Sequence, residues 1–225
     1  MTASDSSVGD PTLYGVMDRL MASFTAEELV PEVSRAREQY EARRGLVRED
    51  EELWDLWSQI FVEWFALEWT GGEDERPPAA RMLERIPEGK DAVTLRAWLR
   101  SQRALCEILA MRSGVVRVRD LLRGGMFEVT ENRSLHGVDV GDIAEVRLIG
   151  FDGRVRFGRT FLFHPSGTRA VIEDQVAQRL AQKMSPEEIL DHCAQLRLRT
   201  ERYRHVDPVR VYRAATEELP SSGDI

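Results

Sequence analysis

Residues 114–130 read GVVRVRDLLRGGMFEVT, and this stretch decides the fold that the sequence predicts. In its first half apolar side chains alternate with arginines, and the alternation returns after two glycines. Such alternation is typical of half-buried β-strands. Similar runs fill residues 143–163, where Asp152-Gly153 is a hairpin signal. Residues 113–167 are therefore expected to form a small antiparallel β module, an SH3-like or OB-like barrel.

The chain before this module has the spacing of helices. Apolar residues recur every three or four positions from residue 13 onward, and residues 25–28 (TAEE) form a capping box. Another helix is expected over residues 91–111, because its apolar positions keep the same spacing. The sequence therefore predicts a helical domain at residues 11–112.

Residues 50–69 form the most apolar helical segment and are rich in tryptophan and phenylalanine. We interpret this segment as the central core helix, with acidic residues such as Glu63 and Glu68 facing solvent. An aromatic face of this size is also compatible with a partner-binding groove or a cofactor site. Both of these alternatives stay open at this point.

Helical spacing returns after the β module, so residues 168–206 are expected to form C-terminal helices that pack on the core. Residues 1–10 read as a disordered tail and residues 207–225 as an extended or disordered tail. The expected fold class is α+β, with an N-terminal helical bundle, a small β module and C-terminal helices.

Composition limits the classes of protein that the chain can represent. The 225 residues carry a formal net charge of −8, which repels polyanions at long range. No apolar run is long enough to cross a membrane, and the N-terminal residues lack the pattern of a secretory signal. Two cysteines, Cys106 and Cys193, fit a reducing cytoplasm, and the preference for arginine over lysine suggests a GC-rich bacterial genome. We therefore expect a cytoplasmic protein without membrane insertion.

Basic residues gather in the β module. Residues 112–169 carry a net charge of +3, whereas residues 1–111 carry −9 and residues 170–225 carry −2. Guanidinium groups bind carboxylates and phosphates through paired hydrogen bonds. These arginines are therefore candidates for binding an acidic protein partner, a nucleotide or a nucleic acid, although they can also pair with acids of the helical part. The candidate binding residues are Arg117, Arg119, Arg123, Arg133, Arg147, Arg154 and Arg156.

Two short motifs in this region resemble those of PilZ domains. Residues 119–123 (RDLLR) match RxxxR, and residues 132–137 (NRSLHG) match NxSxxG, with eight residues between the two motifs. In PilZ domains these motifs bind cyclic di-GMP, with the arginines on phosphates and guanines. The resemblance implies a nucleotide sensor in which Arg119 and Arg123 bind the nucleotide and residues 132–137 line the mouth of the barrel.

A longer stretch, over about residues 50–165, resembles uncharacterised bacterial proteins that often end in a SEC-C zinc motif. The similarity rests on FVEWF at 61–65, AARML at 79–83, VRVRDLLRG at 116–124 and GDI at 141–143. The cysteines of the zinc motif are absent here. This resemblance implies the order of the elements, without a metal site and without an activity.

Motifs of catalysis are missing from the sequence. The four histidines are scattered without metal-ligand spacing, and the chain has no GxSxG, Walker or GxGxxG motif. We therefore predict no catalytic residue, no metal and no cofactor, and favour a non-catalytic adaptor or regulatory protein that binds an acidic partner through its β module. The alternatives are a nucleotide or nucleic-acid sensor and a subunit of a larger assembly. The oligomeric state stays open.

Overall fold

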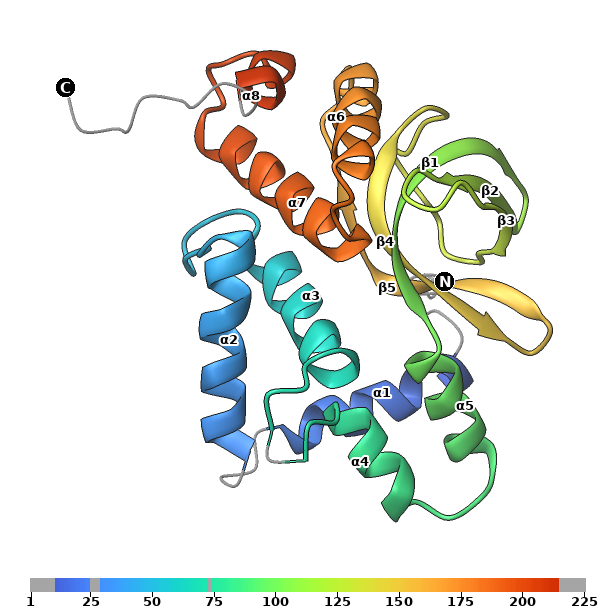
Figure 1. The fold of residues 1–225 in the computed structure, drawn as a ribbon. Helices are drawn as coiled ribbons and strands as arrows, with labels where there is room; N and C mark the ends of the chain where they lie inside the picture. Colours follow the sequence, from blue (N-terminus) through green and yellow to red (C-terminus); the bar gives the residue numbers. More distant parts are fainter. Residues whose placement is uncertain (1–10, 25–28, 73, 215–225) are drawn as a thin grey trace, which may run out of the picture.

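The computed structural model describes residues 11–24, 29–72 and 74–214. The capping box expected at 25–28 and the tail expected at 1–10 lie outside the described residues, as do residues 215–225. The elements, in chain order, are α1 (Pro11–Ser23), α2 (Val30–Arg44), α3 (Trp54–Leu67), α4 (Pro78–Arg85), α5 (Lys90–Leu99), β1 (Gln102–Arg112), β2 (Val115–Asp120), β3 (Met126–Thr130), β4 (Ile143–Phe151), β5 (Arg154–Phe163), α6 (Arg169–Ala181), α7 (Pro186–Arg202) and α8 (Pro208–Ala214). The expected α+β class is confirmed, with helices on both sides of the β module in the sequence (Figure 1).

The five strands close into a barrel in the order β1-β2-β3-β5-β4. Four neighbouring pairs are antiparallel, as expected, but β3 and β5 are parallel, with Val129 opposite Val155. The entirely antiparallel module that the sequence predicted is therefore wrong in this one pairing. The strand order and the single parallel pair are those of an OB-type barrel, one of the two barrels expected.

The first strand lies where a helix was expected. Helix α5 ends at Leu99, and residues 102–112 form β1, so the predicted helix over residues 91–111 is wrong in its second half. Most of β1 is buried on both faces, because Leu105 packs against the C-terminal helices while Cys106 faces the barrel interior. A strand buried on both faces has a continuous apolar sequence that periodicity does not separate from a helix.

The C-terminal helices expected over residues 168–206 are confirmed as α6 and α7. Ser185 begins α7 with the capping box that the sequence indicates, because its hydroxyl accepts from the Glu188 amide and the Glu188 carboxylate accepts from the Ser185 amide. Residues 208–214, which were assigned to the tail, form α8 instead, and Tyr212 of this helix is buried.

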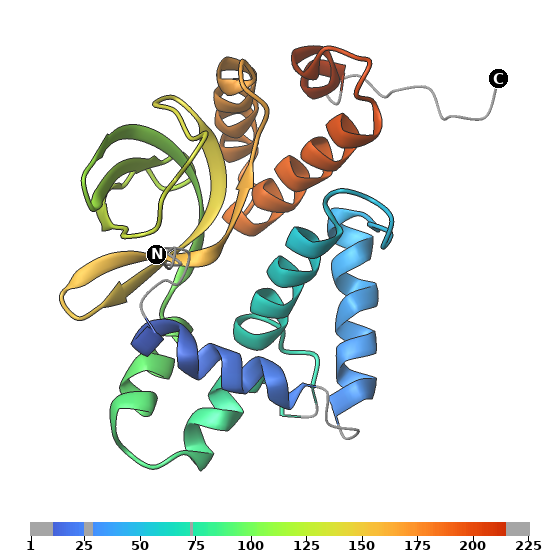
Figure 2. The same ribbon diagram turned by 180° about the vertical axis from the view of Figure 1, so that it is seen from behind.

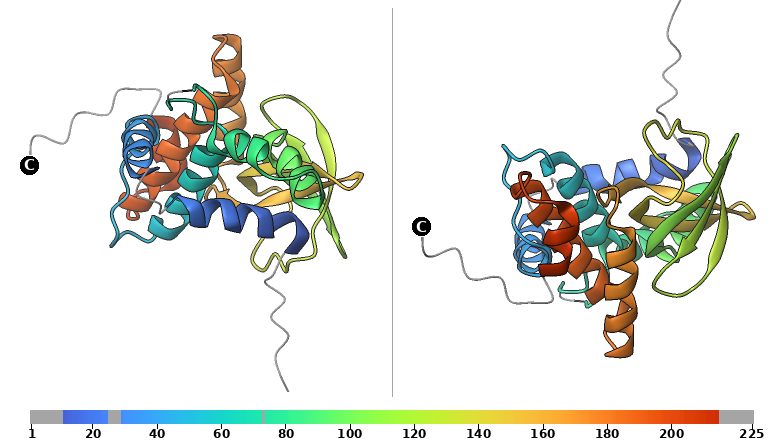
Figure 3. Two further views of the ribbon diagram at one scale, coloured as in Figure 1. Left: turned by 90° about the horizontal axis from the view of Figure 1, so that it is seen from below. Right: turned by 90° about the horizontal axis from the view of Figure 1, so that it is seen from above.

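The helices cover only part of the barrel. Helices α3, α5 and α7 pack on β5, β4 and β1 respectively. Strands β2 and β3 lie on the side of the barrel that faces away from α2 and α7, as the views in Figures 1 and 3 show. The outer surface of β2 and β3 is therefore the part of the sheet that remains open to a partner.

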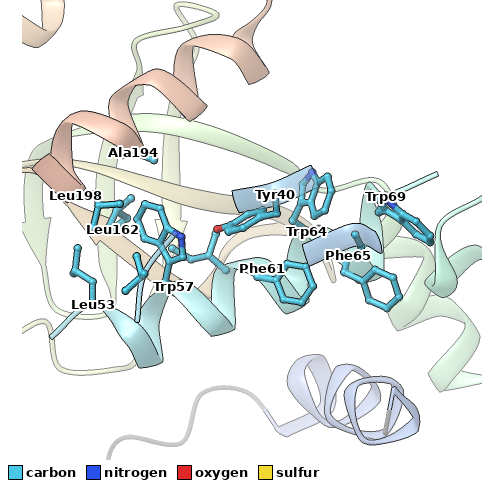
Figure 4. Close-up of a cluster of buried hydrophobic side chains, with 13 residues drawn as sticks. Tyr40, Leu53, Trp57, Phe61, Trp64, Phe65, Trp69, Leu162, Ala194 and Leu198 are labelled. Atoms are coloured by element: carbon cyan, nitrogen blue, oxygen red, sulfur yellow. The ribbon is translucent and has the colours of Figure 1, made fainter. Parts of the chain in front are cut away.

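Helix α3 is the centre of the helical core, as predicted. Its Trp57, Phe61, Trp64 and Phe65 are buried and pack around Tyr40 of α2, and Figure 4 shows these rings in a row along the helix. Full burial of each large ring contributes roughly 1.5–3 kcal/mol to stability. The aromatic face is therefore used mainly by the fold itself.

Candidate functional site

The outer face of β2, β3 and β5 carries arginines in register. On β2, Val116 and Val118 point into the barrel, so the alternating Arg117 and Arg119 point outward. Arg117 lies opposite Glu128 of β3. On β5, Val155 joins the barrel interior, which places Arg154 and Arg156 on the outer side. We use the name arginine face for the outward-pointing side chains of Val115, Arg117, Met126, Glu128, Arg154 and Arg156.

Two arginines of this face are exposed and have no acidic group close by among the described residues. Arg117 and Arg154 are exposed, and neither has an acidic group within 4.0 Å in the described part of the chain. The recorded polar contact of Arg117 is with the sulfur of Met126, at 3.9 Å. Met126 is itself 61% exposed, and Val115 is 37% exposed. The arginine face therefore combines two exposed cations that lack an acidic group within 4.0 Å among the described residues, Arg117 and Arg154, with exposed apolar side chains.

Arg119 and Arg123, by contrast, are engaged with acids of the same chain. The Arg119 guanidinium binds Glu107 of β1 at 2.7 Å and Glu173 of α6 at 2.5 Å. The Arg123 guanidinium lies 3.4 Å from Glu187 at the start of α7. These two predicted binding residues attach the barrel to the C-terminal helices.

Arg133 is also bound within the chain. Its guanidinium binds Glu131 at 2.7 Å and donates to the Gly158 carbonyl at 2.8 Å, and it lies over the Phe161 ring at 5.1 Å. The three arginines of the two PilZ-like motifs therefore bind separate partners on β1, α6, α7 and β5 and at Glu131, which follows β3.

Arg147 lies in a buried polar cluster between the barrel and the helices, and is only 2% exposed. Its guanidinium binds Glu68, which follows α3, and donates to the Ser101 hydroxyl at 3.2 Å. Its Nε atom lies 3.5 Å from the Glu63 carboxylate. Glu63 is 3% exposed, so the prediction that this residue faces solvent is wrong.

The same cluster contains residues that the sequence did not single out. We define the buried arginine network as Arg44, Arg103 and Arg147 with Glu63, Glu68, Glu145 and Asp191. Arg44 binds Glu145 through both terminal nitrogens, at 3.0 and 2.5 Å. Asp191 lies 3.3 Å from Arg44, and Glu68 lies 2.9 Å from Arg103.

Electrostatics in this network follow from burial and pairing. Burial raises the pKa of Glu145, but the nearby Arg44 and Arg103 lower it more, so the net shift is downward. Burial lowers the pKa of Arg44, and Glu145 raises it more, so the guanidinium stays charged. The network therefore holds opposite charges in place between the barrel and the helices.

A cleft of about 560 Å³ lies beside the network. Its walls include Trp64, Trp69, Arg43, Arg103, Arg123, Glu68 and Glu187. Each arginine here has a carboxylate within ion-pair distance, because Arg43 binds Asp191 at 2.6 Å, and the other two bind Glu68 and Glu187. The positive charge of the cleft is therefore offset from within, and the arginine face remains the stronger candidate.

The Cys193 thiol and the His164 imidazole are both buried. Burial raises the pKa of the Cys193 thiol to about 12, and burial lowers the pKa of His164 to about 4. His164 Nδ1 shares a hydrogen bond with the Tyr212 hydroxyl at 2.6 Å. Across the described ranges, no group of three or more histidine, cysteine, aspartate or glutamate residues is arranged to hold a metal ion. No described helix is both long and apolar enough to cross a bilayer.

Comparisons with protein-family models, with curated proteins and with solved structures found no match to this chain.

Proposed function

We propose that this chain is a non-catalytic adaptor or regulatory protein that docks an acidic segment of a partner protein on the arginine face. The observation that carries the proposal is that Arg117 and Arg154 are exposed on the arginine face without an acidic group within 4.0 Å among the described residues. Guanidinium groups at such positions bind carboxylates through two parallel hydrogen bonds.

The chemistry of the face favours a protein over a nucleic acid. Single-stranded nucleic acids bind barrels of this type through bases that stack on aromatic side chains. The arginine face carries Val115 and Met126 between its charges and no aromatic side chain. Methionine adapts its shape to apolar partner surfaces. The net charge of −8 also opposes the approach of a polyanion.

A cytoplasmic location is part of this proposal. It is supported by Cys106 and Cys193, which are both buried and unpaired, as in proteins of reducing compartments.

Site-specific photo-crosslinking tests the proposal. A photoreactive amino acid is placed at Met126, and the protein is irradiated in an extract of the native cell. A second protein carries the same group at Val93, which is 56% exposed on α5. We expect adducts at position 126 and not at position 93, with crosslinked peptides rich in aspartate and glutamate.

Charge reversal provides the matched control. Arg117→Glu/Arg154→Glu should abolish the adducts at position 126, whereas Arg85→Glu/Arg100→Glu, an equal charge change at exposed sites of α4 and the α5–β1 turn, should leave them intact. Equal yields from the two double variants would refute the proposal. Adducts with nucleic acid, or a thermal shift with cyclic di-GMP that Arg117→Glu/Arg154→Glu removes, would replace it with the sensor alternative.

A further inference from the structure

A second cavity, of about 570 Å³, lies between α1, α2, α3 and β5 and is separate from the arginine face. Figure 2 shows the three helices together from behind. Its walls are mainly apolar and include Met21, Phe24, Phe61, Phe65, Arg37 and Glu63. Cavities of this size and composition are typical of small-molecule sites.

Glu63 is a buried carboxyl group in the wall of this cavity, and it is only half satisfied. Its Oε2 atom accepts from the Thr160 hydroxyl at 3.4 Å and lies 3.5 Å from Arg147 Nε. Its Oε1 atom is buried and has no hydrogen-bond partner. An unpartnered buried polar atom is costly, so its presence in a folded chain calls for a partner that the chain itself does not supply.

The surroundings of Glu63 shift its pKa upward. Burial raises the pKa of this carboxyl, and Arg147, the Arg159 amide and the Thr160 hydroxyl only partly oppose the rise. Because Oε2 faces donors, a proton taken up by this carboxyl would lie on Oε1, where it makes the group a hydrogen-bond donor.

The other charged groups of the cavity are cations. Arg37 lies over the Phe61 ring at 4.3 Å, and its ion pair with Glu41 is long, at 3.9 Å. Arg159 also lines the cavity and binds Asp18 at 2.5 Å. The polar groups at this cavity are thus arranged to donate hydrogen bonds to a ligand.

We propose that this cavity binds a small organic carboxylate with a ring-sized apolar body. One oxygen of the carboxylate is held by the Arg37 guanidinium, the other oxygen meets Glu63 Oε1, and the apolar body packs against Phe24, Phe61 and Phe65. A cationic amine suits the site less well, because it would meet the guanidinium groups of Arg37 and Arg159.

Calorimetry and thermal shift with matched probes test the proposal. The probes are 2-naphthoate and 2-naphthylmethylamine, which share the apolar body and differ in the sign of the charge. We expect 2-naphthoate to bind and to raise the melting temperature, and the amine to do neither. Arg37→Gln should weaken naphthoate binding by about tenfold or more, the effect of losing one charge-assisted hydrogen bond. Arg35→Gln, at an exposed site on the same helix, should leave binding unchanged.

Glu63 has its own pair of variants. Glu63→Leu removes the donor and should weaken naphthoate binding, while Glu63→Gln retains an N–H donor and should restore it. No heat and no thermal shift with millimolar naphthoate would overturn the proposal. Tighter binding of the amine would also overturn it, because that result requires an ionised Glu63.

Discussion

Replacement of Arg44 by methionine tests the buried arginine network directly. Arg44 is 1% exposed, and its terminal nitrogens bind Glu145 at 3.0 and 2.5 Å, with Asp191 at 3.3 Å. Methionine keeps much of the packing against Tyr40 and Trp57, over whose rings the guanidinium lies. The substitution therefore mainly removes one cation from two buried carboxylates, of which Glu145 keeps Arg103 at 3.4 Å and Asp191 keeps Arg43 at 2.6 Å.

Removing one partner of a buried ion pair costs about 3–5 kcal/mol. For a chain of this size, each kcal/mol lowers the melting temperature by about 2–4 °C, so Arg44→Met should lower it by roughly 6–20 °C. Urea unfolding followed by tryptophan fluorescence, together with calorimetry, measures the loss. Arg204→Met removes a pair in which both side chains are more than 60% exposed, and it should cause no measurable change.

A double variant separates the lost pair from lost packing. In Arg44→Met/Glu145→Gln, the carboxylate charge of Glu145 is removed together with its cation, and Arg103 retains Glu68 as a partner at 2.9 Å. The double variant should therefore be more stable than Arg44→Met alone. A double variant that is no more stable than the single variant would refute the electrostatic reasoning.

The pH dependence of the free energy of unfolding gives a second test of the role of Arg44. In the wild type, burial raises the pKa of Glu145, but Arg44 and Arg103 lower it below its unfolded value of 4.5. Its stabilising contribution is therefore present above that value and is lost as the pH falls through the lower folded pKa. In Arg44→Met the pKa of Glu145 in the folded state should rise, so that Glu145 binds a proton on folding. The difference in the free energy of unfolding between wild type and Arg44→Met should therefore become smaller from pH 7 to about pH 5. A difference in the free energy of unfolding that stays constant with pH, or that is below about 1 kcal/mol at pH 7, would contradict the assigned role of Arg44 as the cation of Glu145.

The capping box of α7 depends on the Ser185 hydroxyl, and Ser185→Ala should cost about 1 kcal/mol, measured as a lower urea midpoint. Gly45 ends α2 with φ +97°, and an added Cβ would lie 2.8 Å from Leu198 Cδ2, so Gly45→Ala should cost more than about 1 kcal/mol in the same assay. Burial lowers the pKa of His164 and of His192 to about 4 each, so the folded chain keeps both neutral while the unfolded chain binds protons below its histidine pKa of 6.5. The urea midpoint should therefore fall as the pH drops from about 6.5 to 4, and it should fall less in His164→Phe; an equal fall would exclude His164 as a cause.

Most of the barrel could be predicted from the sequence, but the prediction for its first strand was wrong. Strands β2, β3 and β5 have one face in the barrel interior, with turn signals between strands, so their periodicity is visible. β4 is buried on both faces, but its charged Glu145 and Arg147 keep the alternation visible. β1 is also buried on two faces and reads QRALCEILAMR, in which alanine, leucine, glutamate and methionine all favour helices. Only pairing with β2 and β4, which are remote in the sequence, makes this segment a strand.

The candidate site was predicted in part, for a related reason. The alternation on β2 and β5 correctly placed Arg117, Arg119 and Arg154 on the outside of the sheet. Whether an arginine is paired depends on acids that are remote in the chain, as Glu145 is from Arg44, which precedes it by 101 residues. No local pattern encodes such a pairing. An acid inside an apolar helical run, as Glu63 is within α3, is the one local signal of the network that the sequence did contain.

The buried arginine network also restricts how this chain can be recombined with others. Its charges come from α2, α3, β1, β4 and α7, so no cut between the barrel and the helices leaves them matched. A gene fusion that transplanted residues 102–163 alone would expose Arg103, Glu145 and Arg147 on a surface without their counter-ions. The segment from α2 to α7 therefore behaves as one structural unit. Recombination between genes would have to transfer this whole segment to keep the ion pairs intact.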